Sequence, residues 1–389
     1  MSATNSFNGD IHTDISQIPE KIDDFKRHID GLRGERIAGI CGFDGFIDTF
    51  IRLQNPATMA EFGPKVSEAA GISASYPVHH LGDKFGGNGP LFAVALHDVL
   101  SGNVDISYIG ALGKGTVLPI FQEALAGKVQ CIHTLAEPAH SDCLEFNDGK
   151  IMLSDMRSCA DVTWERLMEY VGEKALDAML MRSRFVAAVN WGKLVNVGGI
   201  WENMARRMGE LGIPKKEVVF FMDLAEFEQR PREDRLGLVE LVSKITAQCQ
   251  TLLSLNLKEA WQMADEFGGD FHGRKAPGEI GEVAAFIRKH IDADRILVHP
   301  NDGAACASDT GCIYIPGPYC KQPLISTGAG DNFGAGCLAG VLSSMDDLDI
   351  LLSGVCASGH FVRSGKSASY QEIGQLASLW CAGRLPERL

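Results

Sequence analysis

The chain has 389 residues, of which 45% are hydrophobic and 22% charged, as in a soluble globular enzyme large enough for one big α/β domain. Its formal net charge of -14 excludes a protein that grips a nucleic-acid backbone through a basic face. Small anionic ligands, which a local site can hold, stay open.

No apolar run approaches the roughly 20 residues of a membrane helix, and the polar N-terminus lacks the pattern of a secretory signal peptide. The eleven cysteines include no CxxC pair, which favours reduced thiols over a disulfide framework or a zinc site. We therefore expect a cytoplasmic protein with neither nucleic-acid nor membrane partners.

The first predicted element is an amphipathic helix. Isoleucine, leucine and phenylalanine recur at three- and four-residue steps over residues 14–33, and Pro19 is tolerated only in the first turn of such a helix. We expect residues 1–36 to form an N-terminal helical extension that packs on the main domain. A partner-binding arm is the alternative.

Apolar strands then alternate with helical stretches. Strands are predicted at residues 36–43, 106–113, 185–192, 217–224, 251–256 and 295–300, and helices at residues 160–181, 198–212 and 232–248. This alternation is typical of a parallel sheet covered on both faces. Because no repeat, low-complexity tract or linker interrupts the pattern, we predict a single α/β domain over residues 37–389.

Residues 132–158 follow a different pattern. Polar and apolar residues alternate there and turn at Asn147-Asp148-Gly149, which is a hairpin signal. A polar-faced hairpin within an α/β chain often covers a site, so we expect a small β lid.

A glycine-rich turn at residues 324–340 surrounds a single acid, Asp331. A dinucleotide-binding GxGxxG fingerprint does not fit, because the last spacing is one residue too long. A Walker A loop does not fit either, because the nearest match, residues 359–367, has five residues between its glycines instead of four.

The third interpretation of this turn is an anion hole. The amides of Gly328, Ala329 and Gly330 carry little bulk, and a helix begins directly after them, so an anion would be stabilised there. Asp331, in the first turn of that helix, is placed to accept the proton of an attacking hydroxyl. The alternative is that Asp331 merely stabilises the helix N-terminus. These residues alone leave both interpretations open.

The segment STGAGDNFGAG (residues 326–336) closely resembles the C-terminal signature DTxGAGDxF of the PfkB (ribokinase-like) carbohydrate kinases, with Ile325 in place of the leading Asp and Ser326 in place of the Thr. Other landmarks follow the family's order over most of the chain. FGGNGPLFAVAL (85–96) resembles the N-terminal GG signature, MDLAEFEQR (222–230) resembles the DxNxR region, and NLKE (256–259) matches the NxxE motif in full. In VHPNDGAACA (298–307), only Gly303 of the family's nucleotide turn is kept.

The resemblance implies a ribokinase-like α/β fold, in which a central, mostly parallel sheet is flanked by helices on both faces and carries a small β lid formed near residues 46–84 and 132–158. It implies transfer of the γ-phosphoryl group of ATP to a hydroxyl of a sugar or sugar-like acceptor, with Mg²⁺ and with a homodimer formed through the lid. Asp331 would be the base, and Gly328, Ala329 and Gly330 the anion hole.

Two groups of binding residues follow from the same resemblance. The acceptor would contact Asp48, which we place at the end of the first strand, and also Asp44, Gly86, Gly87 and Asn88. The nucleotide would contact Asn256, Glu259, Asp223, His299 and Gly303, and Asn256 and Glu259 would hold Mg²⁺ through water. For the NLKE motif, a helix start capped by Asn256 is the alternative.

Three other functions stay open at this point. They are a nucleoside kinase of the same fold, a kinase homologue that binds ligand without catalysis, and a nicotinamide-dependent oxidoreductase.

Overall fold

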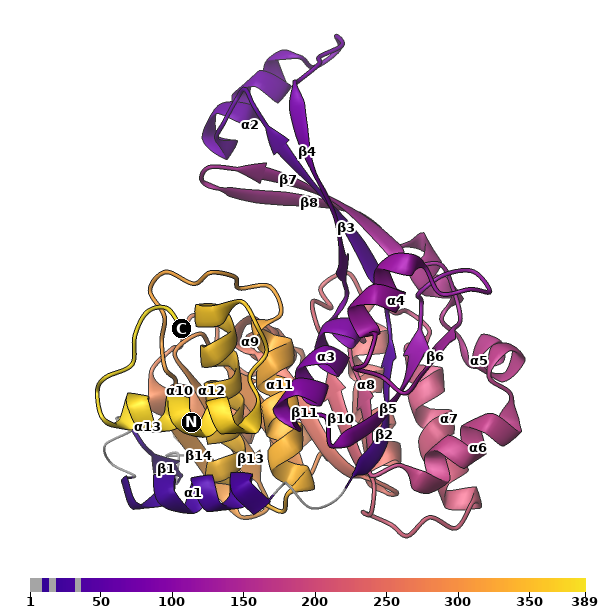
Figure 1. Ribbon diagram of the computed structural model, residues 1–389, viewed down its shortest axis with the longest axis vertical. Coiled ribbons are helices and arrows are strands. Elements are labelled where there is room, and N and C mark those ends of the chain that lie inside the picture. Colours follow the sequence, from indigo (N-terminus) through magenta and orange to yellow (C-terminus); the bar gives the residue numbers. More distant parts are fainter. Residues whose placement is uncertain (1–8, 14–18, 32–35) are drawn as a thin grey trace.

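A ten-stranded, mostly parallel sheet organises the main body (Figure 1). The computed structural model describes residues 9–13, 19–31 and 36–389. The strands lie in the order β1-β14-β13-β12-β11-β10-β9-β2-β5-β6, and the pairs β12–β13 and β13–β14 are antiparallel. Their bounds are β1 (Asp10–Ile11), β2 (Ile37–Phe43), β5 (Val104–Gly110), β6 (Cys131–Thr134), β9 (Phe185–Ala188), β10 (Val219–Asp223), β11 (Gln250–Asn256), β12 (Arg295–His299), β13 (Gly303–Ser308) and β14 (Gly311–Pro316). The predicted parallel sheet and its six strands are confirmed.

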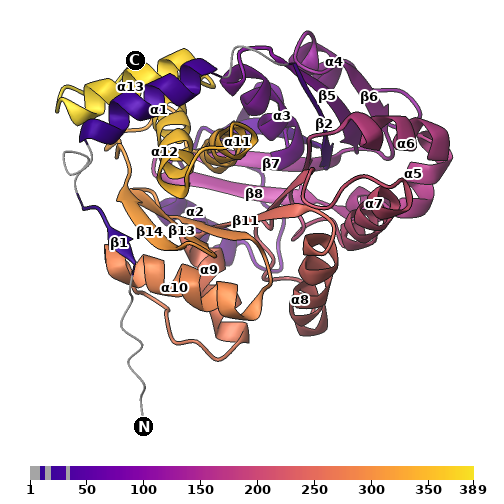
Figure 2. The same cartoon turned by 90° about the horizontal axis from the view of Figure 1, so that it is seen from below.

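Helices cover both faces of this sheet, as predicted (Figure 2). One face carries α1 (Pro19–Gly31), α3 (Asn88–Val99), α4 (Pro119–Leu125), α11 (Ala329–Leu342), α12 (Asp347–Ser364) and α13 (Tyr370–Cys381). The other carries α5 (Trp164–Tyr170), α6 (Glu173–Arg182), α7 (Val197–Glu210), α8 (Arg232–Thr246), α9 (Leu257–Glu266) and α10 (Pro277–His290). Each face has its own apolar core, because strands buried on both sides present apolar side chains in both directions.

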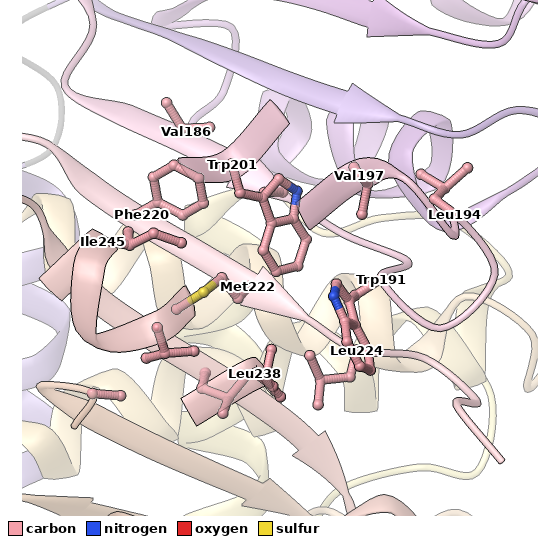
Figure 3. Close-up of a cluster of buried hydrophobic side chains, with 14 of the residues drawn as sticks. Val186, Trp191, Leu194, Val197, Trp201, Phe220, Met222, Leu224, Leu238 and Ile245 are labelled. Atoms are coloured by element: carbon pink, nitrogen blue, oxygen red, sulfur yellow. The ribbon is translucent and has the colours of Figure 1, made fainter. Parts of the chain in front are cut away.

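Figure 3 shows part of the core between β10 and the helices α7 and α8. Trp201 of α7 meets Phe220 of β10 edge-on, with their ring centroids 6.2 Å apart. Both side chains are fully buried, and truncating such an aromatic residue costs about 3–5 kcal/mol. This packing fixes strand β10, which ends at Asp223.

The lid is a separate four-stranded sheet that projects from the body (Figure 1). It has the order β4-β3-β7-β8 and is built from β3 (Phe46–Leu53), β4 (Val78–Gly86), β7 (Ala139–Phe146) and β8 (Gly149–Asp155), with α2 (Met59–Glu68) between β3 and β4. The hairpin turn falls at Asn147-Asp148, as predicted. The predicted lid segment 132–158 is too long at its start, because residues 131–134 form β6 at the edge of the main sheet.

Two other predictions can be compared with the structure. The predicted helix 160–181 is wrong, because Gly172, at φ +80°, divides α5 from α6. In the predicted extension, residues 1–8, 14–18 and 32–35 lie outside the described residues. The rest joins the main body, since β1 pairs with β14 and Ile22 and Phe25 of α1 are buried in the core.

Two further properties concern the whole described chain. All eleven cysteines are free thiols, and eight of them are buried. Within residues 9–13, 19–31 and 36–389, none of the helices combines the length and the apolar character needed to cross a bilayer.

Glycines let α11 approach α12 closely. A Cβ atom added at Gly336 would lie 2.6 Å from the Ser353 carbonyl oxygen, and one at Gly354 would lie 2.5 Å from the Cys337 Sγ. Any side chain at these positions would therefore push the two helices apart.

We predict that Gly336→Ala lowers the free energy of unfolding by about 1–3 kcal/mol, because the added methyl group overpacks this interface. Gly199→Ala is the matched control, since Gly199 lies in α7 with no atom within 4 Å of an added Cβ atom. The control should be neutral or stabilising by up to about 1 kcal/mol. Urea unfolding measures both values, and equal stabilities for the two variants would contradict the packing argument.

Candidate active site

Polar side chains gather where five neighbouring strands end. Asp44 follows β2, Asn190 follows β9, Asp223 ends β10, Asn256 ends β11 and His299 ends β12. Ligands of open α/β sheets bind outside the carboxyl ends of the strands. The topology therefore brings these residues, far apart in the sequence, to one edge of the sheet.

Two cavities open at this edge. The larger, of about 600 Å³, lies between the lid and the body and is lined by both Asp48 and Asp331. The smaller, of about 390 Å³, is lined by Gly303, by residues 317–321 and by residues of α12. Both volumes suit small-molecule ligands. The cavities share three lining residues, Asn256, His299 and Gly330, so they meet at the start of α11.

The start of α11 has the geometry of an anion site, with one change from the sequence prediction. Gly328 caps the helix in a left-handed conformation, φ +93°, which favours glycine, and no side chain caps the helix. The Ala329 amide donates to the Ser326 carbonyl at 3.1 Å. In the described part of the chain, the amides of Gly328 and Gly330 are therefore the ones left to face an anion.

Asp331 lies one residue further on and is only 7% exposed. Asn88 Nδ2 donates to Asp331 Oδ1 at 3.1 Å and so orients the carboxyl group. Burial, and then the charges of Asp223 and Asp44, raise the pKa of Asp331 well above its ordinary value. A carboxylate with a raised pKa takes up a proton more readily, as a general base must.

The two aspartates predicted to hold the acceptor have different surroundings. Asp44 is fully buried and accepts bonds from the amides of Asn88 (2.9 Å) and Gly89 (2.7 Å) and from Asn190 Nδ2 (2.6 Å). Asp44 does not line either cavity. Its carboxylate instead fixes the start of α3, and through it Asn88.

Asp48 lies on lid strand β3, which corrects our expectation that it ends the first strand of the main sheet; Asp44 has that place. Asp48 Oδ1 is buried without a hydrogen-bond partner in the described structure, and the side chain lines the larger cavity. Gly86 makes room for it, because a Cβ atom there would lie 2.5 Å from Asp48 Oδ2. Gly87 and Asn88 line the same cavity.

The NLKE motif forms the predicted helix cap. Asn256 Oδ1 accepts from the Glu259 amide at 2.9 Å, and Glu259 Oε2 accepts from the Asn256 amide at 3.0 Å. Both residues also line the larger cavity, so capping does not remove them from the site.

Repulsion between acids makes this site suited to a cation. Burial, and then the charge of Asp223, raise the pKa of Glu259 to about 8. Burial raises the pKa of Asp223 to about 6. A hydrogen bond from the Ala225 amide opposes this rise, and the charge of Asp44 adds to it. Both Glu259 oxygens already accept a bond from Asn256, and the described residues hold no cluster of three ligating side chains. These oxygen donors fit Mg²⁺ held through its water shell.

His299 stands between the cavities as a neutral ring. It packs on Phe333 with ring centroids 4.6 Å apart, and burial lowers the pKa of His299 to about 4. Gly303 lines the smaller cavity, where a Cβ atom would lie 2.1 Å from Tyr314 Oη.

Several residues of the site were not predicted from the sequence. Asn190 and Lys193 follow β9, and their polar character directly after an apolar strand was a usable signal. Arg363, buried in α12, donates to the carbonyls of Pro318 (2.7 Å) and Tyr319 (2.7 Å) and so holds the wall of the smaller cavity. Nothing in the local sequence indicates that role.

Comparisons of the sequence and of the structure with known proteins point to the same kinase family and fold. A family model described as prokaryotic ketohexokinase matches residues 20–380. The ketohexokinase of Haloferax volcanii is 24% identical over 361 residues, which span 88% of this chain and 92% of that protein. The structure of Arabidopsis thaliana ribokinase complexed with ribose and ATP aligns with a TM-score of 0.63 at 14% identity, over 88% of this chain and 99% of that one. Ribokinase from Cryptococcus neoformans, in complex with ADP, aligns with a TM-score of 0.62 at 15% identity, over 88% and 99%. The predicted ribokinase-like fold is confirmed.

The acid cluster predicts a pH-dependent stability. Glu259 has a pKa of about 8 in the folded protein and about 4.3 in an unfolded chain, so between these values only the folded state keeps the proton. Stability of the ligand-free protein should therefore fall as the pH rises from about 5 to about 8. Glu259→Gln cannot ionise, so its unfolding temperature should fall less over this range.

Glu279→Gln provides the matched control, because Glu279 makes the same capping-box bond at the start of α10. This control should keep the wild-type pH dependence. A Glu259→Gln profile parallel to wild type would contradict the assignment.

Proposed function

The chain belongs to the prokaryotic ketohexokinase family, within the PfkB ribokinase-like carbohydrate kinases, and we propose that it transfers the γ-phosphoryl group of ATP to a hydroxyl of a ketohexose. The observation that carries this proposal is the meeting of two cavities at Gly330, directly beside Asp331. One cavity suits the nucleotide and the other the acceptor. The ribose and ATP of the Arabidopsis thaliana ribokinase structure support this pairing of ligands.

The lining of the larger cavity supports an uncharged acceptor. Five of its lining residues carry a carboxyl group, and the lining ammonium group, on Lys193, lies 3.4 Å from Glu226. A sugar phosphate or sugar acid would meet repulsion there, whereas sugar hydroxyls donate hydrogen bonds to carboxylates. This favours a neutral sugar.

The transfer is an in-line displacement. The acceptor oxygen forms a bond to the γ-phosphorus while its proton passes to Asp331, and the bond from phosphorus to the bridging oxygen breaks as ADP leaves with the electron pair. The amides of Gly328 and Gly330, with the positive end of α11, stabilise the charge on the transferring group. Asn88 holds Asp331 in place.

Asn256 and Glu259 are the residues we propose to hold Mg²⁺ through water. When bound, this ion would neutralise phosphate charge. His299 and Gly303 line the cavity that we assign to the nucleotide. Asp223 lines the larger cavity, where it adds to the negative charge that favours the cation.

We also propose a second copy of the chain as the partner of the lid. The lid exposes apolar side chains, at 41% for Val78, 50% for Leu81 and 56% for Leu153. Exposed apolar residues on the edge strands of a sheet favour association. Sedimentation velocity of the purified protein should show a dimer, and a monomer at micromolar concentration would contradict the proposal.

Loss of the base should abolish most of the activity. Asp331→Asn keeps the shape of the side chain and removes the proton acceptor, which typically costs about 10²–10⁴-fold in rate. In an ADP-release assay with a ketohexose, we expect kcat to fall at least a hundredfold, while calorimetry shows ATP affinity within about threefold of wild type.

The exposed Asp309, in the turn between β13 and β14, offers a control for this assay. Asp309→Asn should keep wild-type activity. A folded Asp331→Asn variant with full activity would exclude the assigned role. Running pentoses and nucleosides in parallel separates a nucleoside kinase from the proposed activity.

Asp48→Ala should weaken binding of the acceptor and leave ATP binding unchanged. Hydrogen bonds to a charged group are worth about 1.5–3 kcal/mol each, so the acceptor KM should rise by roughly tenfold to over a hundredfold per bond lost. Asp44→Asn should instead lower stability and kcat, because Asp44 holds Asn88 and does not line the cavity. If Asp44→Asn raised the acceptor KM and Asp48→Ala did not, Asp44 would be the residue that binds the acceptor.

A further inference from the structure

One face of the lid sheet looks into the larger cavity. Asp48 pairs in register with Ser141, and Ser141 with Ser154, so these side chains share a face. All three line the cavity. Steps of two along β8 place Met152, another lining residue, and then Lys150 on the same face.

Lys150 reaches from the lid to the body. Its Nζ donates to Thr327 Oγ1 at 3.3 Å, across 177 positions of sequence. Thr327 directly precedes Gly328, so Lys150 bonds the residue next to the turn whose amides face the proposed phosphoryl position. The charge of Lys150 also acts on Asp48: burial raises the pKa of Asp48, and a bond from Ser141 and then Lys150 oppose that rise. Lys150 thus lies between the acceptor side and the phosphoryl side.

The negative charge around the proposed phosphoryl position favours an additional cation there, and the ammonium of Lys150 could supply it. Asp223, Glu259 and Asp331 contribute acidic groups there, and the entering triphosphate adds more negative charge. The ammonium of Lys193, which lines the larger cavity, pairs with Glu226. Lys150 is exposed, and its bond to a neutral hydroxyl on the surface is weak, so it can exchange Thr327 for a phosphate oxygen at little cost.

We propose that Lys150 is a catalytic residue supplied by the lid, whose ammonium donates to the non-bridging oxygens of the transferring phosphoryl group. The inference rests on the proposed kinase function. Lys150 keeps its proton throughout: the acceptor's proton goes to Asp331, the new bond joins the acceptor oxygen to phosphorus, and the broken bond releases ADP. The lid therefore completes the anion hole in addition to covering the sugar.

Lys150→Met tests this role, with Lys84→Met as the control of equal charge change. Lys84 is the register partner of Asp48, and its ammonium lies 4.9 Å from the Phe50 ring, while that of Lys150 lies 5.9 Å from the same ring. Of the two lysines, Lys150 is the one bonded to Thr327 of the body. Loss of one preorganised donor typically costs about 10²–10³-fold in kcat. We expect Lys150→Met to lower kcat by about that factor, with acceptor KM and ATP affinity within about threefold, and Lys150→Arg to recover part of the rate.

Lys84→Met should keep kcat within about twofold of wild type. Unchanged kcat in Lys150→Met, an equal loss in Lys84→Met, or a rise in acceptor KM alone would each overturn the inference. Because Lys150 is exposed, thermal unfolding should show a folded variant. The two variants also distinguish a failure of this inference from a failure of the proposed function. If Lys150→Met is active while Asp331→Asn is inactive, only the role of Lys150 is wrong. If Asp331→Asn is active, the proposed kinase mechanism itself is wrong.

Discussion

Mutual repulsion among buried carboxyl groups at one edge of the sheet is the constraint on which the rest of the structure depends. Asp44, Asp223, Glu259 and Asp331 are brought together by strand and helix ends, and burial raises the pKa of each. Placing such groups out of water is costly unless they are paired. Asp44 has three donors, but the others are left partly uncompensated. The cores on both faces of the sheet supply the stability that keeps this arrangement folded.

Asn88 links the parts of the site. Its amide donates to Asp44 and its side chain donates to Asp331, so one residue at the start of α3 connects the end of β2 with the start of α11. The lid continues from the same region, since β4 ends at Gly86. Asp44, Asp331 and the lid are therefore positioned by a few adjacent backbone segments. A displacement of α3 would misplace all three at once.

The sequence predicted the elements whose signals are local. Apolar runs gave the parallel strands, and the glycine turn led to Asp331. No role was predicted for Gly334 and Gly336, which allow α11 to pack closely on Phe221 and on α12. The position of Asp48 was not predictable, because it depends on pairing between residues 46–53 and residues 139–146, about ninety positions apart. The β13–β14 hairpin was missed because neither strand alternates: β13 is rich in alanine and β14 is a nearly continuous apolar run.

The reactivity of buried thiols can report on the motion of the helices that carry them. Cys337 lies on α11 and Cys356 on α12, both are buried, and burial raises the pKa of each. A protonated thiol shielded from solvent does not react with an alkylating reagent. The Cys337 Sγ faces α12, because a Cβ atom at Gly354 would lie 2.5 Å from it, so alkylation of Cys337 requires α11 to separate from α12. The rate of that reaction measures how often α11, the helix that carries Asp331, separates from α12, without any label being introduced into the chain.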